Sequence, residues 1–309
     1  MAEKASSYPV LAVLGPTASG KTSAALKIAK EFNGVIINCD SRQIYEGMII
    51  GTASPSDEEK QQVEHKLFNF VSPNIQFNAS DYATLSAQAI KEVWQKKQIP
   101  ILVGGTGFYY SAISEGLGEA GSDPALSEKL QKELEENGLS YMVSKLQKID
   151  PEAAETIDIN NSRRVLRAIE VVTSTGRPFS QNKPKQLLPE AEFCPIVVTQ
   201  PRQELHKRIE LRINQMFKEG LEREVKHIID TYGRDAAAVS SIGYREWLDY
   251  FDKKVSFEEL KNLILVHTRQ YAKRQETWFR KKPGVPFIDL KLKDSEKIIS
   301  EKVAFFLKN

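Results

Sequence analysis

The sequence has few of the residues that build disulfide frameworks and metal clusters. Only two of its 309 residues are cysteines, Cys39 and Cys194, and they lie far apart without metal-ligand spacing. Each follows or lies in an apolar, strand-like run, so we expect two buried free thiols and no disulfide. The four histidines form no metal-binding pattern either.

Long apolar runs and internal repeats are missing too. No run approaches the roughly 20 residues of a membrane span, and residues 1–8 are too short and polar for a signal peptide. These absences predict a cytoplasmic protein with no membrane partner. Hydrophobic residues make up 41% of the chain and charged residues 27%, which favours a packed core over disorder. The length predicts two domains, or one domain with a large insertion.

Neither sign of charge is in large excess, since the net charge is +2, but the charges are unevenly spread. Acidic residues predominate over residues 101–158, and basic residues predominate over residues 159–282. A basic second half indicates a polyanionic partner. Taken alone, the same pattern is also typical of solvated helix faces.

The most informative stretch is a glycine-rich loop between a predicted strand, residues 10–14, and a helix-compatible segment, residues 22–32. Its glycines let successive N–H groups point into one concavity, to which the helix dipole adds positive potential. Lys21 would reach an outer phosphate, and the Thr22 hydroxyl would face a bound Mg²⁺. The pattern predicts a diphosphate- or polyphosphate-binding loop made of Gly15, Pro16, Thr17, Ala18, Ser19, Gly20, Lys21 and Thr22.

Two further strands are expected to end beside this loop. Residues 34–39 form a strand that leads into Asp40, and residues 99–103 form another that leads into the Gly-rich turn at 104–107. In open α/β sheets, ligands lie at the carboxyl ends of the strands. Asp40 is therefore interpreted as a helix N-cap, as a site carboxylate that serves as a base or metal ligand, or as both.

The chain is predicted to be an α/β protein whose parallel-sheet core is interrupted by a helical insertion. Residues 1–118 and 190–309 form the two parts of the core, and residues 119–189 form the insertion, for which no convincing strand is expected. Helical patterns within it cover residues 124–136, 139–149, 151–157 and 162–174. The last of these presents Arg163, Arg164 and Arg167 on one broad face.

Several motifs, taken in order, resemble the bacterial tRNA dimethylallyltransferase family. They span nearly the whole chain and are Gly15–Thr22, Asp40–Tyr45, Gly51–Ala53, Gly104–Tyr109, Asn161–Arg164, Gly243–Glu246, Thr268–Gln275 and Thr277–Arg280. The resemblance implies a P-loop, nucleotide-kinase-like core with a helical insertion. It also implies Mg²⁺-dependent transfer of a dimethylallyl group from its diphosphate to the exocyclic amine of the adenine 3′-adjacent to the anticodon.

The resemblance assigns roles to residues of this chain. The loop Gly15–Thr22 would hold the diphosphate of dimethylallyl diphosphate rather than ATP. Asp40 would accept a hydrogen bond or proton from the adenine amine, while Thr106 and Arg212 would stabilise the leaving diphosphate. Thr22 and Asp40 would hold Mg²⁺, with waters and phosphate oxygens completing its shell.

The same resemblance implies how tRNA is held. Ser41, Arg42 and Gln43, with Asp40 and Thr106, would contact the extruded adenine and its neighbours. The insertion, through Arg163, Arg164 and Arg167, would contact the anticodon stem-loop. The absence of long self-complementary heptads favours a monomer.

Other functions share parts of this pattern. A small-molecule or nucleotide kinase would have the same loop and Mg²⁺, and the three arginines of residues 163–167 could form its phosphate clamp. A nucleotide-gated RNA-binding protein without chemistry is a second alternative, and prenyl transfer to free adenosine nucleotides is a third. The motif at residues 40–43 and the basic second half favour a macromolecular acceptor over the kinase.

Overall fold

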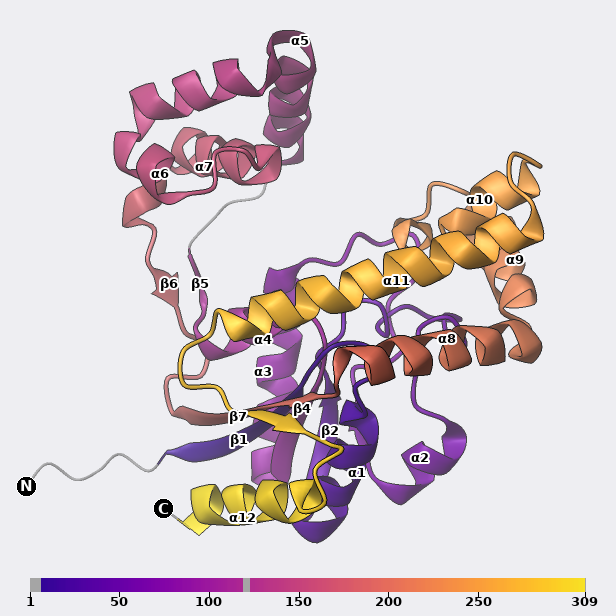
Figure 1. Ribbon diagram of the computed structural model, residues 1–309. Coiled ribbons are helices and arrows are strands. Elements are labelled where there is room, and N and C mark those ends of the chain that lie inside the picture. The colour runs from indigo at the N-terminus through magenta and orange to yellow at the C-terminus, as the bar shows by residue number, and fades with distance from the viewer. Residues whose placement is uncertain (1–6, 119–122, 309) are drawn as a thin grey trace, which may run out of the picture. The chain divides into compact units, whose positions relative to one another are not determined.

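The computed structural model describes residues 7–118 and 123–308 of the chain (Figure 1). The chain divides into two compact units, and each is described by itself. The core unit consists of residues 1–114 and 187–309, and the helical insertion consists of residues 115–186. From the sequence we had placed the edges of the insertion at residues 119 and 189.

A parallel sheet organises the core unit. In the described residues it has six strands in the order β3-β2-β4-β1-β7-β8, and every neighbouring pair is parallel. Parallel pairing with helical crossovers is the α/β architecture that the sequence predicted, so that prediction is confirmed. The strands are β1 (Tyr8–Leu14), β2 (Gly34–Asn38), β3 (His65–Lys66), β4 (Ile99–Gly104), β7 (Ala191–Thr199) and β8 (Phe287–Asp289).

Both faces of the central strand are buried, as expected for a doubly covered parallel sheet. Along β1, Val10 and Leu14 point into one hydrophobic core, while Leu11 and Val13 point into the other. This alternation follows from the two-residue period of a strand. Helices α3 (Ala79–Gln95) and α4 (Gly107–Ser114) cover the first face, and α1 (Lys21–Glu31) and α12 (Ser295–Lys308) cover the second (Figure 1).

A third core joins the helices that follow β7. Leu205, Ile209, Ile213 and Met216 form a buried stripe along α8, and they pack with Trp247. The helices of this part are α8 (Arg202–Glu219), α9 (Leu221–Tyr232), the 3₁₀ turn η2 (Ala237–Ser240), α10 (Glu246–Phe251) and α11 (Phe257–Arg280); the remaining helix of the core unit is α2 (Asp57–Gln62). Helix α11 begins with a Ser256–Glu259 capping box.

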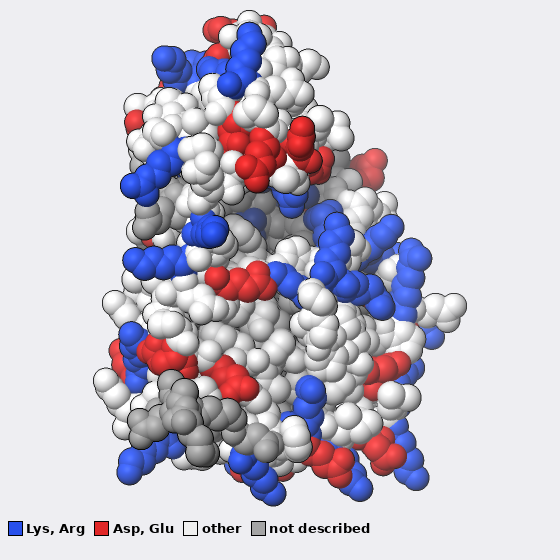
Figure 2. All heavy atoms as spheres, turned by 90° about the vertical axis from the view of Figure 1, so that its left-hand side faces the viewer, with Lys and Arg blue, Asp and Glu red and all other residues white. Residues whose placement is uncertain are grey.

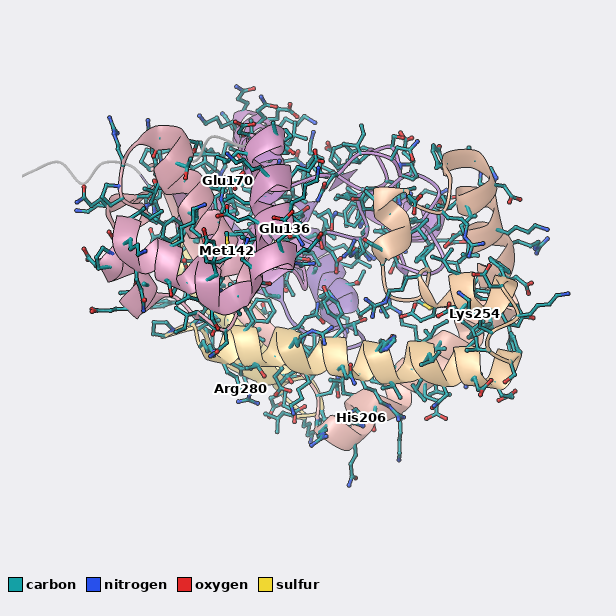
Figure 3. All side chains as sticks on the ribbon, turned by 90° about the horizontal axis from the view of Figure 1, so that it is seen from above. Glu136, Met142, Glu170, His206, Lys254 and Arg280 are labelled. Carbon is teal, nitrogen blue, oxygen red and sulfur yellow. The ribbon has the colours of Figure 1, made fainter. Side chains whose placement is uncertain are left out.

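The helical insertion has its own small core. Met142 is fully buried there with Leu130, Leu146 and Ile169, and Figure 3 labels it among the helices of this unit. Its elements are β5 (Leu117–Gly118), α5 (Pro124–Ile149), α6 (Pro151–Thr156), α7 (Ser162–Thr175), η1 (Phe179–Gln181) and β6 (Pro184–Lys185). These residues form a hydrophobic core of their own, distinct from the three cores of the core unit.

Three sequence expectations are changed or confirmed by the structure. The expectation of no strand in the insertion was wrong, because β5 and β6 pair antiparallel there; two-residue strands are too short to leave a periodic pattern. Helix α5 covers residues 124–149 but is interrupted at Gly138, whose φ of +79° is not helical. The interruption lies at the boundary predicted between the helical segments 124–136 and 139–149. Both cysteines are free and buried, as predicted.

Candidate active site

The phosphate-binding loop predicted from the sequence connects β1 to α1 at the carboxyl edge of the sheet. Helix α1 begins at Lys21, directly after Gly20, whose φ of +98° is readily adopted only by glycine. At Gly15, an added Cβ would lie 2.3 Å from the Val198 carbonyl oxygen of the neighbouring strand. Glycine at position 15 therefore lets the loop pack closely against the sheet, and glycine at position 20 lets the chain turn into α1.

Helix α8 places two arginines against this loop. The Nε of Arg208 donates to the Ala18 carbonyl at 2.8 Å, and one end of the Arg212 guanidinium lies 3.4 Å from the Thr17 hydroxyl. Because residues four apart share a helix face, one helix delivers both cations to the same loop. Arg212 was singled out from the sequence, and the structure brings it to the predicted loop.

Lys21, Arg212 and Asp40 form an electrostatically coupled group. Burial lowers the pKa of the Lys21 ammonium, the Asp40 carboxylate raises it and the Arg212 charge lowers it, and the three together bring it to about 8. Burial likewise lowers the pKa of Arg212, and Asp40 raises it. Two cations held close together in a buried place, with one carboxylate beside them, favour the binding of a further anion.

These residues line one cavity of about 280 Å³. One part of its wall is polar and includes Thr17, Lys21, Thr22, Asp40 and Arg212. Another part is apolar and is contributed by Ile209, Ile213, Met216, Leu221, Ile242 and Ile264. The combination suits a ligand with a strongly anionic end and a hydrocarbon end.

Asp40 lies directly beyond the end of β2, as predicted. One of its carboxylate oxygens accepts the Arg42 N–H at 3.0 Å, and its own N–H donates to the Asn38 side chain at 2.8 Å. These bonds turn the chain sharply after the strand and fix the carboxylate at the cavity wall. The local role and the site role proposed for Asp40 are therefore compatible.

Thr106 and Ser41 are hydrogen-bonded to each other at the carboxyl edge of the sheet. The Thr106 hydroxyl accepts the Ser41 N–H at 2.9 Å and lies 3.2 Å from the Ser41 hydroxyl. These bonds join the loops that follow β4 and β2. Sequence reasoning had expected Thr106 beside the diphosphate; the structure shows its hydroxyl engaged with Ser41, and a contact with the ligand stays a prediction.

Gln275 is a buried residue of the site whose role the sequence analysis missed. Its side chain accepts the Thr17 N–H at 2.9 Å and donates to the Gly105 carbonyl at 2.9 Å. One amide thus ties the loop after β1 to the loop after β4. The residue belongs to the predicted motif Thr268–Gln275, but a partner more than 250 positions away leaves no local pattern.

The other residues predicted to contact tRNA lie in two parts of the chain, the cavity lining and helix α7. Arg42 and Gln43 line the cavity, and the Gln43 amide donates to the carbonyls of Thr52 and Ala53 at 3.1 and 2.8 Å. In the insertion, Arg163 and Arg164 are exposed on α7. Arg167 instead pairs at 2.5 Å with Glu170, a buried carboxylate of the same helix that Figure 3 labels.

A parallel sheet with a Gly-rich loop between its central strand and a helix, closed by cationic side chains from later helices, defines a nucleotide-kinase-like α/β protein. Residues 43–282 match the family described as IPP transferase, so this chain belongs to that family.

Individual relatives and solved structures agree with this assignment. The chain is 40% identical to a tRNA dimethylallyltransferase of Acetivibrio thermocellus, over 96% of this chain and 97% of the relative. It is 38% identical to the Bacillus subtilis enzyme of the same name, over 93% and 95%.

Among solved structures, a tRNA isopentenylpyrophosphate transferase from Bacillus halodurans superposes with a TM-score of 0.73 at 37% identity, covering 97% of both chains. A eukaryotic dimethylallyltransferase acting on tRNA gives a TM-score of 0.81 at 25% identity, over 98% of this chain and 80% of that one. The fold predicted from the sequence is therefore that of its solved relatives.

Proposed function

We propose that this protein transfers a dimethylallyl group from dimethylallyl diphosphate to the exocyclic amine of the adenine 3′-adjacent to the anticodon in tRNA. The observation that carries the proposal is the cavity in which Lys21, Arg212 and Asp40 face an apolar wall. Two cations suit the diphosphate, the wall suits the five-carbon chain, and the carboxylate suits an amine. The family membership of the chain supports the same reaction.

Binding of the donor would use the polar part of the cavity. The backbone N–H groups of the loop after β1 and the N-terminus of α1 offer the positive potential that a diphosphate requires. Lys21 and Arg212 add two side-chain cations to that potential. The electrostatic attraction of both cations for the departing oxygen grows as negative charge builds up on it. They therefore stabilise the transition state more than the bound donor.

The chemical step forms one bond and breaks one. The adenine nitrogen attacks the first carbon of the dimethylallyl group, and the bond from that carbon to the diphosphate oxygen breaks. The electron pair of the broken bond leaves with the diphosphate, and the amine proton passes to Asp40. Two observations support this role for Asp40: it lines the cavity, and one of its carboxylate oxygens accepts the Arg42 N–H.

The residues around the loop fit a magnesium ion. Thr22 and Asp40 line the same cavity and offer hydroxyl and carboxylate oxygens, the donors that Mg²⁺ prefers. Within residues 7–118 and 123–308, no cluster of three or more His, Cys, Asp or Glu side chains is arranged to hold a metal. Thr22 and Asp40 would thus hold the ion with the help of the diphosphate, whose charge it would neutralise.

The acceptor would approach over basic side chains. Arg42, Arg245 and Arg274 also line the cavity, and Figure 2 shows lysine and arginine side chains gathered on part of the face it presents. Such groups suit the phosphates of an RNA whose adenine has been extruded from its stack. A single-strand target is required because the reacting amine is inaccessible in a stacked loop.

The decisive experiment follows labelled dimethylallyl diphosphate in the presence of an unmodified tRNA anticodon stem-loop, AMP or no acceptor. Label in the RNA at the adenine beside the anticodon is the expected result. Label in AMP at an equal rate would indicate transfer to free nucleotides. Phosphate transfer from labelled ATP to any acceptor, at a rate matching prenyl transfer, would favour the kinase and contradict the proposal.

A further inference from the structure

A short loop after β2 forms one side of the cavity. Gly51, Thr52 and Ala53 belong to its lining, and Ala53 has φ of +46°, which is unusual for a residue other than glycine. The Thr52 carbonyl accepts a bond of 3.0 Å from Arg212. The Arg212 guanidinium also lies 3.4 Å from the Thr17 hydroxyl, so it contacts both this loop and the phosphate-binding loop.

The loop is held in place by one carboxylate from α9. One oxygen of Glu224 accepts the N–H groups of Ile49 and Ile50 at 2.9 and 2.7 Å. The other accepts the Gly51 N–H at 2.9 Å and the Tyr244 hydroxyl at 2.5 Å. A carboxylate has about four lone-pair positions, so all the acceptor capacity of Glu224 is used.

Tyr244 contacts both Glu224 and the loop that Glu224 binds. It is fully buried, and burial raises the pKa of its hydroxyl well above 10, so the group remains a donor to Glu224. A Cβ added to Gly51 would lie 2.6 Å from the Tyr244 ring. Gly51 therefore packs so closely against the Tyr244 side chain that a larger residue would clash with it.

We propose that Glu224 is a positioning residue that acts on the donor site through the loop of residues 49–53 and Arg212. Its carboxylate fixes three consecutive backbone N–H groups, the loop then presents the Thr52 carbonyl, and that carbonyl orients Arg212 toward the diphosphate. Pre-orientation of a cation lowers the cost of placing it at the departing oxygen. The inference rests on the proposed function, because it assigns Arg212 to the prenyl donor.

The test uses Glu224→Gln in the full chain. A glutamine has one acceptor oxygen, and its amide nitrogen would face backbone N–H donors, so the loop should lose its fixed shape. We expect kcat/KM for dimethylallyl diphosphate to fall about tenfold, equivalent to about 1.4 kcal/mol, while the KM for the tRNA stem-loop changes less than twofold. The matched control is Glu222→Gln, which removes the same charge from an exposed position on the same helix and should leave both constants unchanged.

A double-mutant cycle asks whether the effect passes through Arg212. If Glu224 acts by orienting Arg212, adding Glu224→Gln to Arg212→Lys should lower kcat/KM much less than adding it to the native chain. If the fold-losses in kcat/KM of the two single variants simply multiplied in the double variant, the proposal would be overturned. A lowered melting temperature with unchanged constants at 20 °C would overturn it too, since a merely structural role predicts that result.

A second variant keeps the test open if Glu224→Gln does not fold. Tyr244→Phe removes one of the four bonds to Glu224 and keeps the ring and the three backbone bonds, so kcat/KM for the donor should fall less than in Glu224→Gln, by about threefold. An unchanged value in this variant would then overturn the proposal. Failure of the proposed function is distinguished separately, because the native chain would then show no preferential transfer of a prenyl group to the tRNA stem-loop.

Discussion

Lys21 combines burial with a cationic role, and this has a consequence for the pH dependence of activity. Its pKa is lowered to about 8, below the ordinary value, because burial disfavours the charged form. Lys21 is therefore charged below about pH 8 and loses its proton as the pH rises through that value. We expect kcat/KM for dimethylallyl diphosphate, which reports the free enzyme, to decline above about pH 8.

A comparison of variants identifies the group responsible for that decline. Arginine stays charged throughout the range, so Lys21→Arg should remove the decline near pH 8 even though its activity is lower. Lys21→Ala should lower turnover by about a hundredfold or more below about pH 8, where the native side chain is charged. An alkaline decline shared by the native chain and Lys21→Arg would show that another group titrates there.

Asp40 is expected to act on the proton rather than on binding. Asp40→Asn keeps the shape of the side chain, and its oxygen can still accept the Arg42 N–H, but the charge is lost. We predict that the single-turnover rate of prenyl transfer falls about a hundredfold or more, while tRNA affinity changes little. Rapid-quench measurements with saturating donor would test this, and an unchanged rate would leave Asp40 as a turn or metal-shell residue.

At the scale of elements, α11 connects two loops through the Gln275 side chain. Gln275→Leu keeps the volume but leaves the Thr17 N–H and the Gly105 carbonyl buried without partners, at about 1–3 kcal/mol each. We expect a clearly lower melting temperature and a higher KM for the donor. Gln270→Leu, at an exposed position of the same helix, is the control, and equal effects from both changes would contradict the role of the bridge.

Helix α7 carries three arginines with two different surroundings. Arg163 and Arg164 are exposed, whereas Arg167 neutralises the buried Glu170. We predict that changing Arg163 and Arg164 together to Gln weakens tRNA binding several-fold and flattens its salt dependence, because phosphate contacts release counterions. Arg167→Gln should mainly lower the melting temperature, since it leaves a buried charge with one partner fewer.

Binding curves over a salt series, with melting temperatures of the same variants, separate these two effects. Donor binding should be unaffected in both variants, because the phosphate-binding loop belongs to the core unit. An unchanged salt dependence after Arg163 and Arg164 are replaced would remove the insertion from tRNA recognition.

What the sequence could reveal depends on the distance between interacting residues. The loop at 15–22, Asp40 and the helices of the insertion follow from local spacing and periodicity, and the structure places them as expected. The bonds from Gln275 and Glu224 to the backbone of the site loops join residues about 170 or more positions apart, so no local pattern indicates them. Very short elements such as β3, β5 and β6 were missed for a related reason, because two residues show no period.

At the scale of the molecule, charge and hydropathy limit what can be predicted about partners. The basic second half predicted a polyanion, and membership of the IPP transferase family supports the same conclusion. Among the helices of the described residues, none combines the length and apolar content of a membrane span. The monomeric state and the use of Mg²⁺ stay predictions.

The paired strands β5 and β6 make the insertion a removable module. Leu117 lies opposite Lys185 and Gly118 opposite Pro184, so the chain enters and leaves this unit through a single two-stranded neck. A segment whose ends lie together can be excised and bridged with little loss of chain entropy. Replacing residues 116–186 by a short Gly-Ser linker should give a core unit that still folds and binds dimethylallyl diphosphate in calorimetry. If the shortened chain failed to fold in circular dichroism, the two units would be one cooperative structure.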